Sequence, residues 1–480
     1  MSESVNLKHQ VLHSLKWVTA CKITSQVYSW LITFWVIRLL MPEDYGIVVM
    51  ADIFFSFLLL TAGSFFGPII IQKQTIEREE MRKLFGMIVC VYSGLFLLQF
   101  FLASSIARYF NSEQVGFVLK ATAICFLFNM FMLIPSALLN KKMAFKAISL
   151  ITAFANITSA SLTLFLAYQG YGFWSIIIGQ IIGAGLKAFL VNVINPYWVM
   201  PSFNWSGTKD LLKFGGLIGI HALLIHAFSY LDITIAGRVL SAAEIGFFAI
   251  ATQLALMPLK KLLPLIRKVA FPAFSKIQQQ PKLIANYILK AQKISLLITF
   301  PVFWGISVTC DYIIPIFLGE KWIPAILPTT LLLLIMPLRF SEELFFPAFR
   351  GMGKVEHLIK NISLLILAMF IGLIIGIQFG VIGIIGVWIT VYPLMYLILL
   401  LRNAHQLSRN IIDFLRPFKE PFFASLAMYI LVSGVKLQLP EITLLNLCIL
   451  IFVGTLTYIF TVHVFNKTIV NEFKAIIKQS

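Results

Sequence analysis

The sequence predicts an all-α polytopic membrane protein, and three observations lead to this fold class. Of the 480 residues, 59% are hydrophobic and only 12% are charged, which leaves too little polar surface to cover a water-soluble protein of this length. Long apolar stretches recur along the chain, separated by breaks rich in Gly, Pro and charge. Basic residues gather in alternate breaks. The first two observations predict membrane-spanning helices, and the third predicts their orientation.

About fourteen stretches reach the roughly 20 apolar residues that a helix needs to cross the hydrocarbon core of a bilayer. They lie near residues 15–40, 45–71, 84–107, 117–139, 147–168, 172–194, 211–236, 245–266, 288–309, 325–347, 357–378, 381–401, 420–437 and 442–464. The segment before the first stretch has no small-residue cleavage site, so we expect no signal peptide.

The distribution of basic residues predicts the topology. With the N-terminus in the cytoplasm, nearly all of the 38 Lys and Arg residues fall in cytoplasmic loops or at span ends on that side. Because cytoplasmic loops of membrane proteins carry the excess of positive charge, both termini are predicted to be cytoplasmic. The net charge of +18 therefore reflects topology, and we expect no nucleic acid as a partner. The exceptions are Arg38, Arg108, Lys120, Arg238, Lys321 and Lys436.

The predicted outward loops are minimal, for example Met41–Asp44, Gln169–Tyr171 and Phe379–Gly380. They leave no room for an external catalytic domain, so we do not expect an enzyme. The five cysteines lie within or beside apolar stretches, without CxxC or other metal-ligand spacing, which is typical of packing residues. We expect neither a metal site nor a cofactor.

A nine-residue pattern recurs in the two halves of the chain. The first predicted span ends in RLLMPEDYG, from Arg38 to Gly46, and the seventh ends in RVLSAAEIG, from Arg238 to Gly246. Each segment predicts a tight outer turn, in which the glycine opens the next helix and the acid lies near its N-terminus. Chance similarity between two apolar segments is the competing explanation.

Six predicted spans, an even number, separate the two patterns, so a repeat would give two halves of the same orientation, related by an axis along the membrane normal. This arrangement predicts two six-helix bundles, at residues 1–200 and 201–405. The basic linker between Arg402 and Lys419 then separates an appended pair of helices with a cytoplasmic tail, at residues 406–480.

Several segments resemble the polysaccharide transporter (Wzx-type) branch of the multidrug, oligosaccharidyl-lipid and polysaccharide exporter superfamily, and the colanic-acid-type flippases in particular. The resemblance covers most of the chain. It rests on Arg38–Gly46, on Arg238–Leu240 with Glu244–Gly246, on Phe271–Gln278 and on Leu318–Trp322.

The resemblance implies two lobes around a central cavity, and alternating access to an undecaprenyl-pyrophosphate-linked oligosaccharide in the bacterial inner membrane. The expected role is a flippase for O-antigen, capsule or exopolysaccharide synthesis. Expected partners are the lipid-linked oligosaccharide and membrane lipids, with the polysaccharide polymerase and the chain-length machinery as further candidates. A cation-coupled multidrug antiporter and a lipid II flippase remain as alternatives, and a membrane glycosyltransferase or polymerase is disfavoured.

A flippase for such a substrate needs cationic side chains in mid-span to neutralise the pyrophosphate. Arg339 is the strongest candidate, because a long apolar run precedes it and Pro337 and Pro347 flank it, which predicts a kinked or broken helix open to a cavity. Glu342 and Glu343 follow on the same helix face. They could pair with Arg339, either at a substrate site or as a structural ion pair.

Two further groups are candidates. Lys22 and Gln26 lie one turn apart in the first span, on much the same face as Ser25 and Ser29, and this face could line the cavity. Lys22 could equally be an interfacial residue. Asp52 and Asp232 are acids near apolar runs that could carry a coupling proton or sodium ion. Proximity to the outer interface for Asp52 and pairing with Arg238 for Asp232 are the alternatives.

Overall fold

The computed structural model describes residues 24–72, 77–204 and 216–465, and throughout these ranges the regular structure is helical, without a strand. This follows from the sequence, because only a helix pairs all its own backbone groups inside a single apolar segment. Within the described ranges, 11 helical segments are long and apolar enough to cross a membrane. Contacts divide the chain into unit 1, residues 1–246, and unit 2, residues 247–480.

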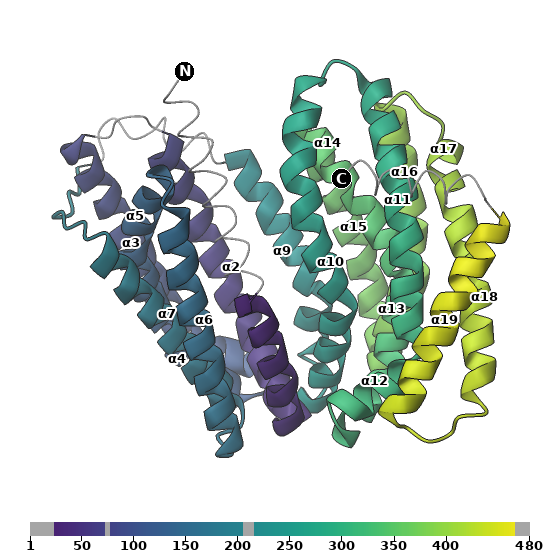
Figure 1. Ribbon diagram of the computed structural model, residues 1–480. Coiled ribbons are helices and arrows are strands. Elements are labelled where there is room, and N and C mark those ends of the chain that lie inside the picture. The colour runs from purple at the N-terminus through teal and green to yellow at the C-terminus, as the bar shows by residue number, and fades with distance from the viewer. Residues whose placement is uncertain (1–23, 73–76, 205–215, 466–480) are drawn as a thin grey trace. The chain divides into compact units, whose positions relative to one another are not determined.

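Unit 1 is a bundle in which α7 packs against both α5 and α6, and α9 packs against α2 (Figure 1). A helix over residues 24–39 precedes α2. The further elements are α2 (Pro42–Gln72), α3 (Arg78–Tyr109), α4 (Glu113–Thr122), α5 (Ile124–Lys141), α6 (Phe145–Tyr168), α7 (Phe173–Ile194) and α9 (Gly216–Ala236), followed by the start of α10 (Ala242–Lys276).

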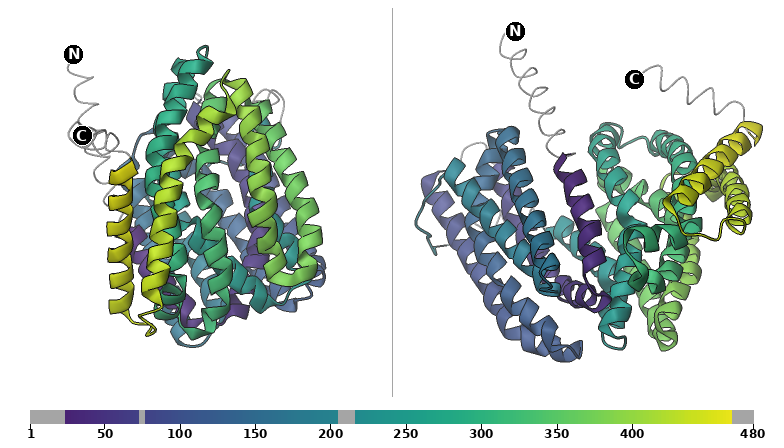
Figure 2. Two further views of the ribbon diagram at one scale, coloured as in Figure 1. Left: turned by 90° about the vertical axis from the view of Figure 1, so that its right-hand side faces the viewer. Right: turned by 60° about the horizontal axis from the view of Figure 1, so that its bottom comes forward.

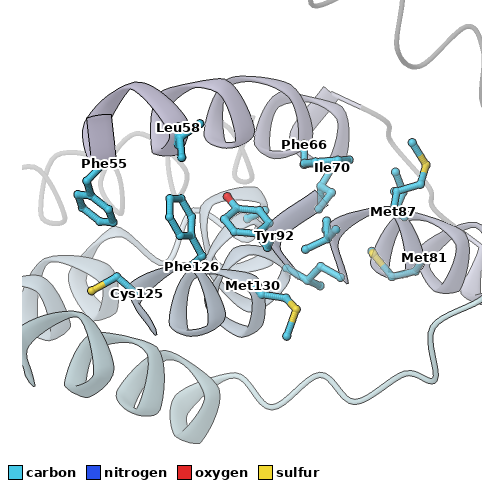
Figure 3. Packing of buried hydrophobic residues seen from close by; sticks show 14 residues of the cluster. Phe55, Leu58, Phe66, Ile70, Met81, Met87, Tyr92, Cys125, Phe126 and Met130 are labelled. Atoms are coloured by element: carbon cyan, nitrogen blue, oxygen red, sulfur yellow. The ribbon is translucent and has the colours of Figure 1, made fainter. Parts of the chain in front are cut away.

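The apolar core of unit 1 joins α2, α3 and α5. Phe55 of α2 meets Phe126 of α5 with their ring centroids 5.4 Å apart, and Tyr92 of α3 lies beside them (Figure 3). Aromatic contacts of this kind fix the position of one helix against the next by packing. Such packing is important in a membrane, because the hydrophobic effect does not drive helices together in lipid.

Unit 2 is a second set of closely packed helices, among which α13 packs against α11 and α16, and α15 packs against α16 (Figure 2). Its elements are the remainder of α10, then α11 (Pro281–Val308), α12 (Cys310–Phe317), α13 (Ile326–Glu343), α14 (Phe345–Gly351), α15 (Val355–Gly376), α16 (Gly380–Gln406), α17 (Ile411–Leu415), α18 (Lys419–Lys436) and α19 (Leu444–Phe465).

The last two helices form the hairpin that the sequence predicts, and α18 packs against α11. Lys436, at the end of α18, makes a 2.8 Å salt bridge to Asp311 of α12, and the Tyr312 hydroxyl donates to the Leu439 carbonyl. At α19, the Tyr458 hydroxyl donates to the Leu297 carbonyl over 2.8 Å. Polar contacts thus fix the hairpin to unit 2.

The two nine-residue patterns form matching turns, and both open a long helix. The Asp44 carboxylate accepts from the Met41 backbone amide over 3.1 Å. The Glu244 carboxylate accepts from the Ser241 amide over 2.9 Å. In each case an acid in the first turn of the new helix satisfies an amide that has no partner within the helix, as the sequence predicts.

The glycines of the two patterns have matching surroundings. A β-carbon on Gly46 would lie 1.9 Å from the Ala242 carbonyl oxygen, and one on Gly246 would lie 1.9 Å from the Pro42 carbonyl oxygen. The starts of α2 and α10 therefore approach each other reciprocally, backbone against backbone, at positions that only glycine can occupy without displacement. This reciprocity argues against chance similarity between the patterns.

The number of fourteen spans stays a prediction, because part of the chain lies outside the described residues. The longest apolar segment, Val355–Gln406, holds both α15 and α16. The predicted division at residues 200 and 405 also stays a prediction; the contacts within the chain divide it after Gly246.

We expect Gly46→Ala and Gly246→Ala each to destabilise the protein by about 1–3 kcal/mol, the usual range for overpacking, because the added methyl collides with a carbonyl of the facing helix. Apparent melting temperature of the purified protein in detergent measures the effect. Gly94→Ala in α3 is the matched control, since its β-carbon would meet nothing within 4 Å. Equal melting of all three variants would contradict the reciprocal contact.

Candidate functional site

A cavity of about 550 Å³ lies inside unit 1 among its membrane-spanning helices. This volume is within the range of about 300–1,000 Å³ typical of small-molecule sites. The helix over residues 24–39, α2, α5, α6 and α7 line it, with Ser29, Ile32, Thr33, Val36, Ile37, Tyr45, Asn129, Met132, Asn156, Ser159, Ala160, Thr163, Ile176, Gln180, Gly183, Ala184 and Lys187.

Small residues bring α6 and α7 together along this wall. A β-carbon on Gly179 would lie 1.9 Å from the Thr163 hydroxyl oxygen, and one on Gly183 would lie 2.8 Å from the Ser159 β-carbon. The Ser159 hydroxyl donates to the Gly179 carbonyl over 2.7 Å. Small and hydroxyl side chains at a helix interface are typical of membrane bundles, and here the same pairing also forms a polar cavity wall.

Lys187 is the cationic residue of this lining. The sequence places it at a cytoplasmic span end. In the structure it lies half-buried within α7, about 10 Å before the end of the helix at 1.5 Å per residue. Gln180, Gly183 and Lys187 are spaced by three and four residues and therefore share one face of α7. Sequence reasoning missed this signal.

The structure describes only some of the candidate residues on the first span. Lys22 lies outside the described residues. Gln26 is half-buried in the helix over residues 24–39, and Ser29 of the same helix, together with Thr33, lines the cavity. The roles proposed for Lys22 and Gln26 therefore stay predictions. The polar helix face that made them candidates includes Ser29, which lines the cavity.

Arg339 lies in unit 2, on α13, where the helix is broken as the sequence predicts: α13 ends at Glu343 and α14 begins at Phe345. The guanidinium carbon of Arg339 sits 5.0 Å from the centroid of the Trp388 ring on α16, a cation–π distance. The Glu342 carboxylate accepts from the Tyr392 hydroxyl over 2.6 Å. The ion pair expected between Arg339 and Glu342 or Glu343 stays a prediction.

A buried hydrogen-bonded chain runs beside this cluster. The Gln292 side chain of α11 donates to the Ser341 hydroxyl over 2.7 Å, and that hydroxyl lies 2.9 Å from the Tyr396 hydroxyl. Trp388, Tyr392 and Tyr396 recur every four residues, so they share one face of α16. Sequence reasoning missed these aromatic partners, because they meet α13 only in the folded protein.

The two candidate coupling acids lie in unit 1. The Tyr230 hydroxyl of α9 donates to the Asp52 carboxylate of α2 over 3.2 Å, and a ring nitrogen of His226 lies 3.2 Å from the Ile53 carbonyl oxygen. Asp232 is 3% exposed, and its carboxylate accepts from the Ile233 amide over 2.8 Å. Being two residues apart, Tyr230 and Asp232 point to different sides of α9, so the structure does not bring the two acids together.

These features define the class of protein: a polytopic helical membrane protein of the transporter fold. The fold matches that of a solved lipid II flippase, MurJ, in an inward closed conformation, with a TM-score of 0.75 at 19% sequence identity, over 94% of this chain and 99% of that one.

Residues 36–327 match the family model described as polysaccharide biosynthesis protein, and the chain belongs to this family. It is 24% identical to an uncharacterized membrane protein in the cps region of Klebsiella pneumoniae, over 99% of both chains. It is 26% identical to the lipopolysaccharide biosynthesis protein WzxC of Escherichia coli, over 56% of this chain and 55% of that protein. These matches confirm the resemblance drawn from the sequence.

We expect Tyr392→Phe to lower the free energy of unfolding by about 1.5–3 kcal/mol, the usual contribution of a hydrogen bond to a charged group, because it removes the donor to Glu342. Apparent melting temperature in detergent reports the loss. Tyr429→Phe on α18 is the control, since its ring packs on Trp304 and no hydrogen bond of its hydroxyl is present in the described chain. Equal melting of the two variants would contradict the structural importance of the bond.

Proposed function

We propose that the protein is a flippase, which carries an undecaprenyl-pyrophosphate-linked oligosaccharide across the bacterial inner membrane for the assembly of O-antigen, capsule or exopolysaccharide. The observation that carries the proposal is the unit 1 cavity, a chamber of about 550 Å³ among membrane-spanning helices, in which amide, hydroxyl and ammonium groups stand among apolar side chains. An ionisable side chain such as Lys187 is costly among membrane-spanning helices unless it faces a cavity or a partner, and such a residue usually has a functional role.

Family membership and relatives named for lipopolysaccharide biosynthesis support the polysaccharide pathway as the setting. The lining of the cavity supports an anionic rather than a cationic substrate. Its described residues include Lys187 and neither Asp nor Glu, whereas a cationic drug would require a carboxylate. The multidrug-antiporter alternative is therefore less consistent with this unit.

A lipid II flippase is the second candidate, favoured by the likeness of the fold to a solved lipid II flippase. Lipid II is also an anionic lipid-linked saccharide, so the cavity alone does not distinguish the two. Which lipid-linked saccharide the chain transports is decided by complementation.

The positive charge of the predicted inner loops supports a topology with both termini in the cytoplasm. Under the proposed function, the alternation of basic loops places the start of α7 outside and its end inside. The polysaccharide polymerase and the chain-length machinery stay predicted partners, since the next enzymes must receive the saccharide on the outer side.

We expect the wild-type chain to restore surface polymer in a flippase-deleted host, and Arg339→Ala to restore less than a tenth of it, because a mid-span cation is lost. Arg339→Lys should keep part of the activity by retaining the charge. Arg108→Ala, an exposed arginine at the end of α3, is the control. Polymer is measured relative to the membrane abundance of each variant.

Two results would contradict the proposal. If the wild type restores no polymer with any available repeat unit but raises drug efflux, the protein is an antiporter. If it rescues depletion of the lipid II flippase and restores no polymer, lipid II is the substrate.

For energetic coupling we propose Asp52 as the proton-binding residue, because its carboxylate lies in a span, where the Tyr230 hydroxyl of α9 fixes its position. In inverted membrane vesicles, we expect an imposed pH gradient to stimulate uptake of a labelled lipid-linked saccharide by the wild type. Asp52→Asn should abolish this stimulation and keep the basal rate. Asp232→Asn is the matched comparison, and loss of the response in this variant alone would move the role to Asp232.

A further inference from the structure

The hydrogen bonds around the unit 1 cavity give its lining a definite polarity. The hydroxyl protons of Thr33, Ser159 and Thr163 are already donated to backbone carbonyls, over 2.7, 2.7 and 2.9 Å. Each of these oxygens therefore keeps lone pairs as acceptors and has no remaining proton to donate. A ligand that meets this part of the wall must bring its own hydrogen-bond donors.

Lys187 and Gln180 supply the opposite chemistry. Within the described part of the chain, neither side chain makes a hydrogen bond or ion pair, and both line the cavity. The lysine ammonium offers three donors and a full charge, and the glutamine amide offers two more donors. In a low-dielectric surrounding such a charge needs a counter-charge, which the lining residues do not supply. An anionic ligand would supply it.

The charge of Lys187 and the hydroxyl groups of α6 lie at different depths. Lys187 lies at one end of the α7 wall and Ile176 at the other, about 16 Å apart along the helix at 1.5 Å per residue. Thr163 is near the C-terminal end of α6, and α6 and α7 are joined there by a short turn. The acceptor hydroxyls of α6 therefore extend away from Lys187 toward that turn. The lining is thus arranged for an elongated ligand that is anionic at one end and rich in hydroxyl groups along the rest.

We infer that this cavity is a binding site for the head of the lipid-linked saccharide, in which Lys187 binds a phosphate. Gln180 lies about 10 Å from Lys187 along α7, beside Gly179, whose carbonyl accepts from Ser159, so Gln180 and the hydroxyl-lined wall form hydrogen bonds with the sugar. The inference rests on the proposed function and goes beyond it, because it assigns recognition of the anionic group to unit 1 and to a residue outside the Arg339 cluster. A phospholipid headgroup carries the same phosphate chemistry, so the test must separate the two sources.

The test measures ligand binding to the purified full-length protein in detergent by microscale thermophoresis. The probes are a polyprenyl pyrophosphate, the uncharged polyprenol of equal chain length, and phosphatidylglycerol. We expect the wild type to bind the pyrophosphate at least tenfold more tightly than the polyprenol or phosphatidylglycerol. Lys187→Gln should weaken binding of the pyrophosphate at least tenfold, since a charge-assisted hydrogen bond is lost.

Lys187→Arg should keep binding within about threefold, because the charge is retained. Lys187→Met guards against a folding defect peculiar to the Gln variant, and elution as a single species in gel filtration checks each protein. Lys120→Gln is the matched control, because Lys120 is an exposed lysine of unit 1 on α4 and lies outside the cavity lining. It should bind as the wild type does.

The inference is overturned if well-folded Lys187→Gln and Lys187→Met bind the pyrophosphate as the wild type does, or if polyprenol or phosphatidylglycerol binds as tightly as the pyrophosphate. Polymer export by the same variants shows whether the binding site, the flippase function or both have been disproved. Wild-type export with unchanged export by Lys187→Gln would leave the flippase intact and remove the site. Failure of wild-type export together with Lys187-dependent binding would remove the flippase role and keep the site.

Discussion

The structure depends on one constraint, that hydrocarbon offers no hydrogen-bond partners. Every backbone amide and carbonyl in the bilayer must be paired within the protein, and this makes the regular structure of the described chain entirely helical. The same constraint acts on side chains. In the spans, hydroxyls such as those of Thr33 and Thr163 donate to a carbonyl one turn earlier in their own helix. A polar cavity built from such helices is therefore rich in acceptors, and its few donors determine what it can bind.

A second consequence concerns helix packing. Without a hydrophobic force between helices, close approach requires small residues. Gly179 and Gly183 let α7 approach the hydroxyl side chains of α6. The same contact packs the two helices and forms the cavity wall. Gly46 and Gly246 serve a related purpose at the starts of α2 and α10. There, neither backbone can move away without losing contact with the other.

Much of the fold was predictable from the sequence because hydropathy and turn chemistry are local. The break between α13 and α14 follows from Pro347, which removes the hydrogen bond to the carbonyl of Glu343, the last residue of α13, whereas Pro337 lies inside α13. The turn at Asp44 follows from an acid and a glycine at fixed spacing. The matching pattern at Glu244 was recognisable for the same reason. These signals need no knowledge of which helices become neighbours.

The residues that meet at each site depend on which helices become neighbours, and they were therefore harder to predict. Arg339 was identified because it interrupts an apolar run, but Tyr392 and Trp388 meet its helix only through the pairing of α13 with α16. Lys187 was assigned to a span end because basic residues usually lie there. Its position in the cavity wall depends on how α5, α6 and α7 pack.

The two cations differ in what compensates their charge, and this difference bears on function. The Arg339 guanidinium lies over the Trp388 ring, and its helix, α13, also carries Glu342 and Glu343. Part of the positive charge of Arg339 is therefore compensated within unit 2. A ligand phosphate there must compete with carboxylates. Lys187 has amides and hydroxyls around it and no carboxylate in the cavity lining, so an arriving anion gains the full attraction. Recognition of charge is therefore better suited to unit 1 than to the α13 and α16 cluster of unit 2.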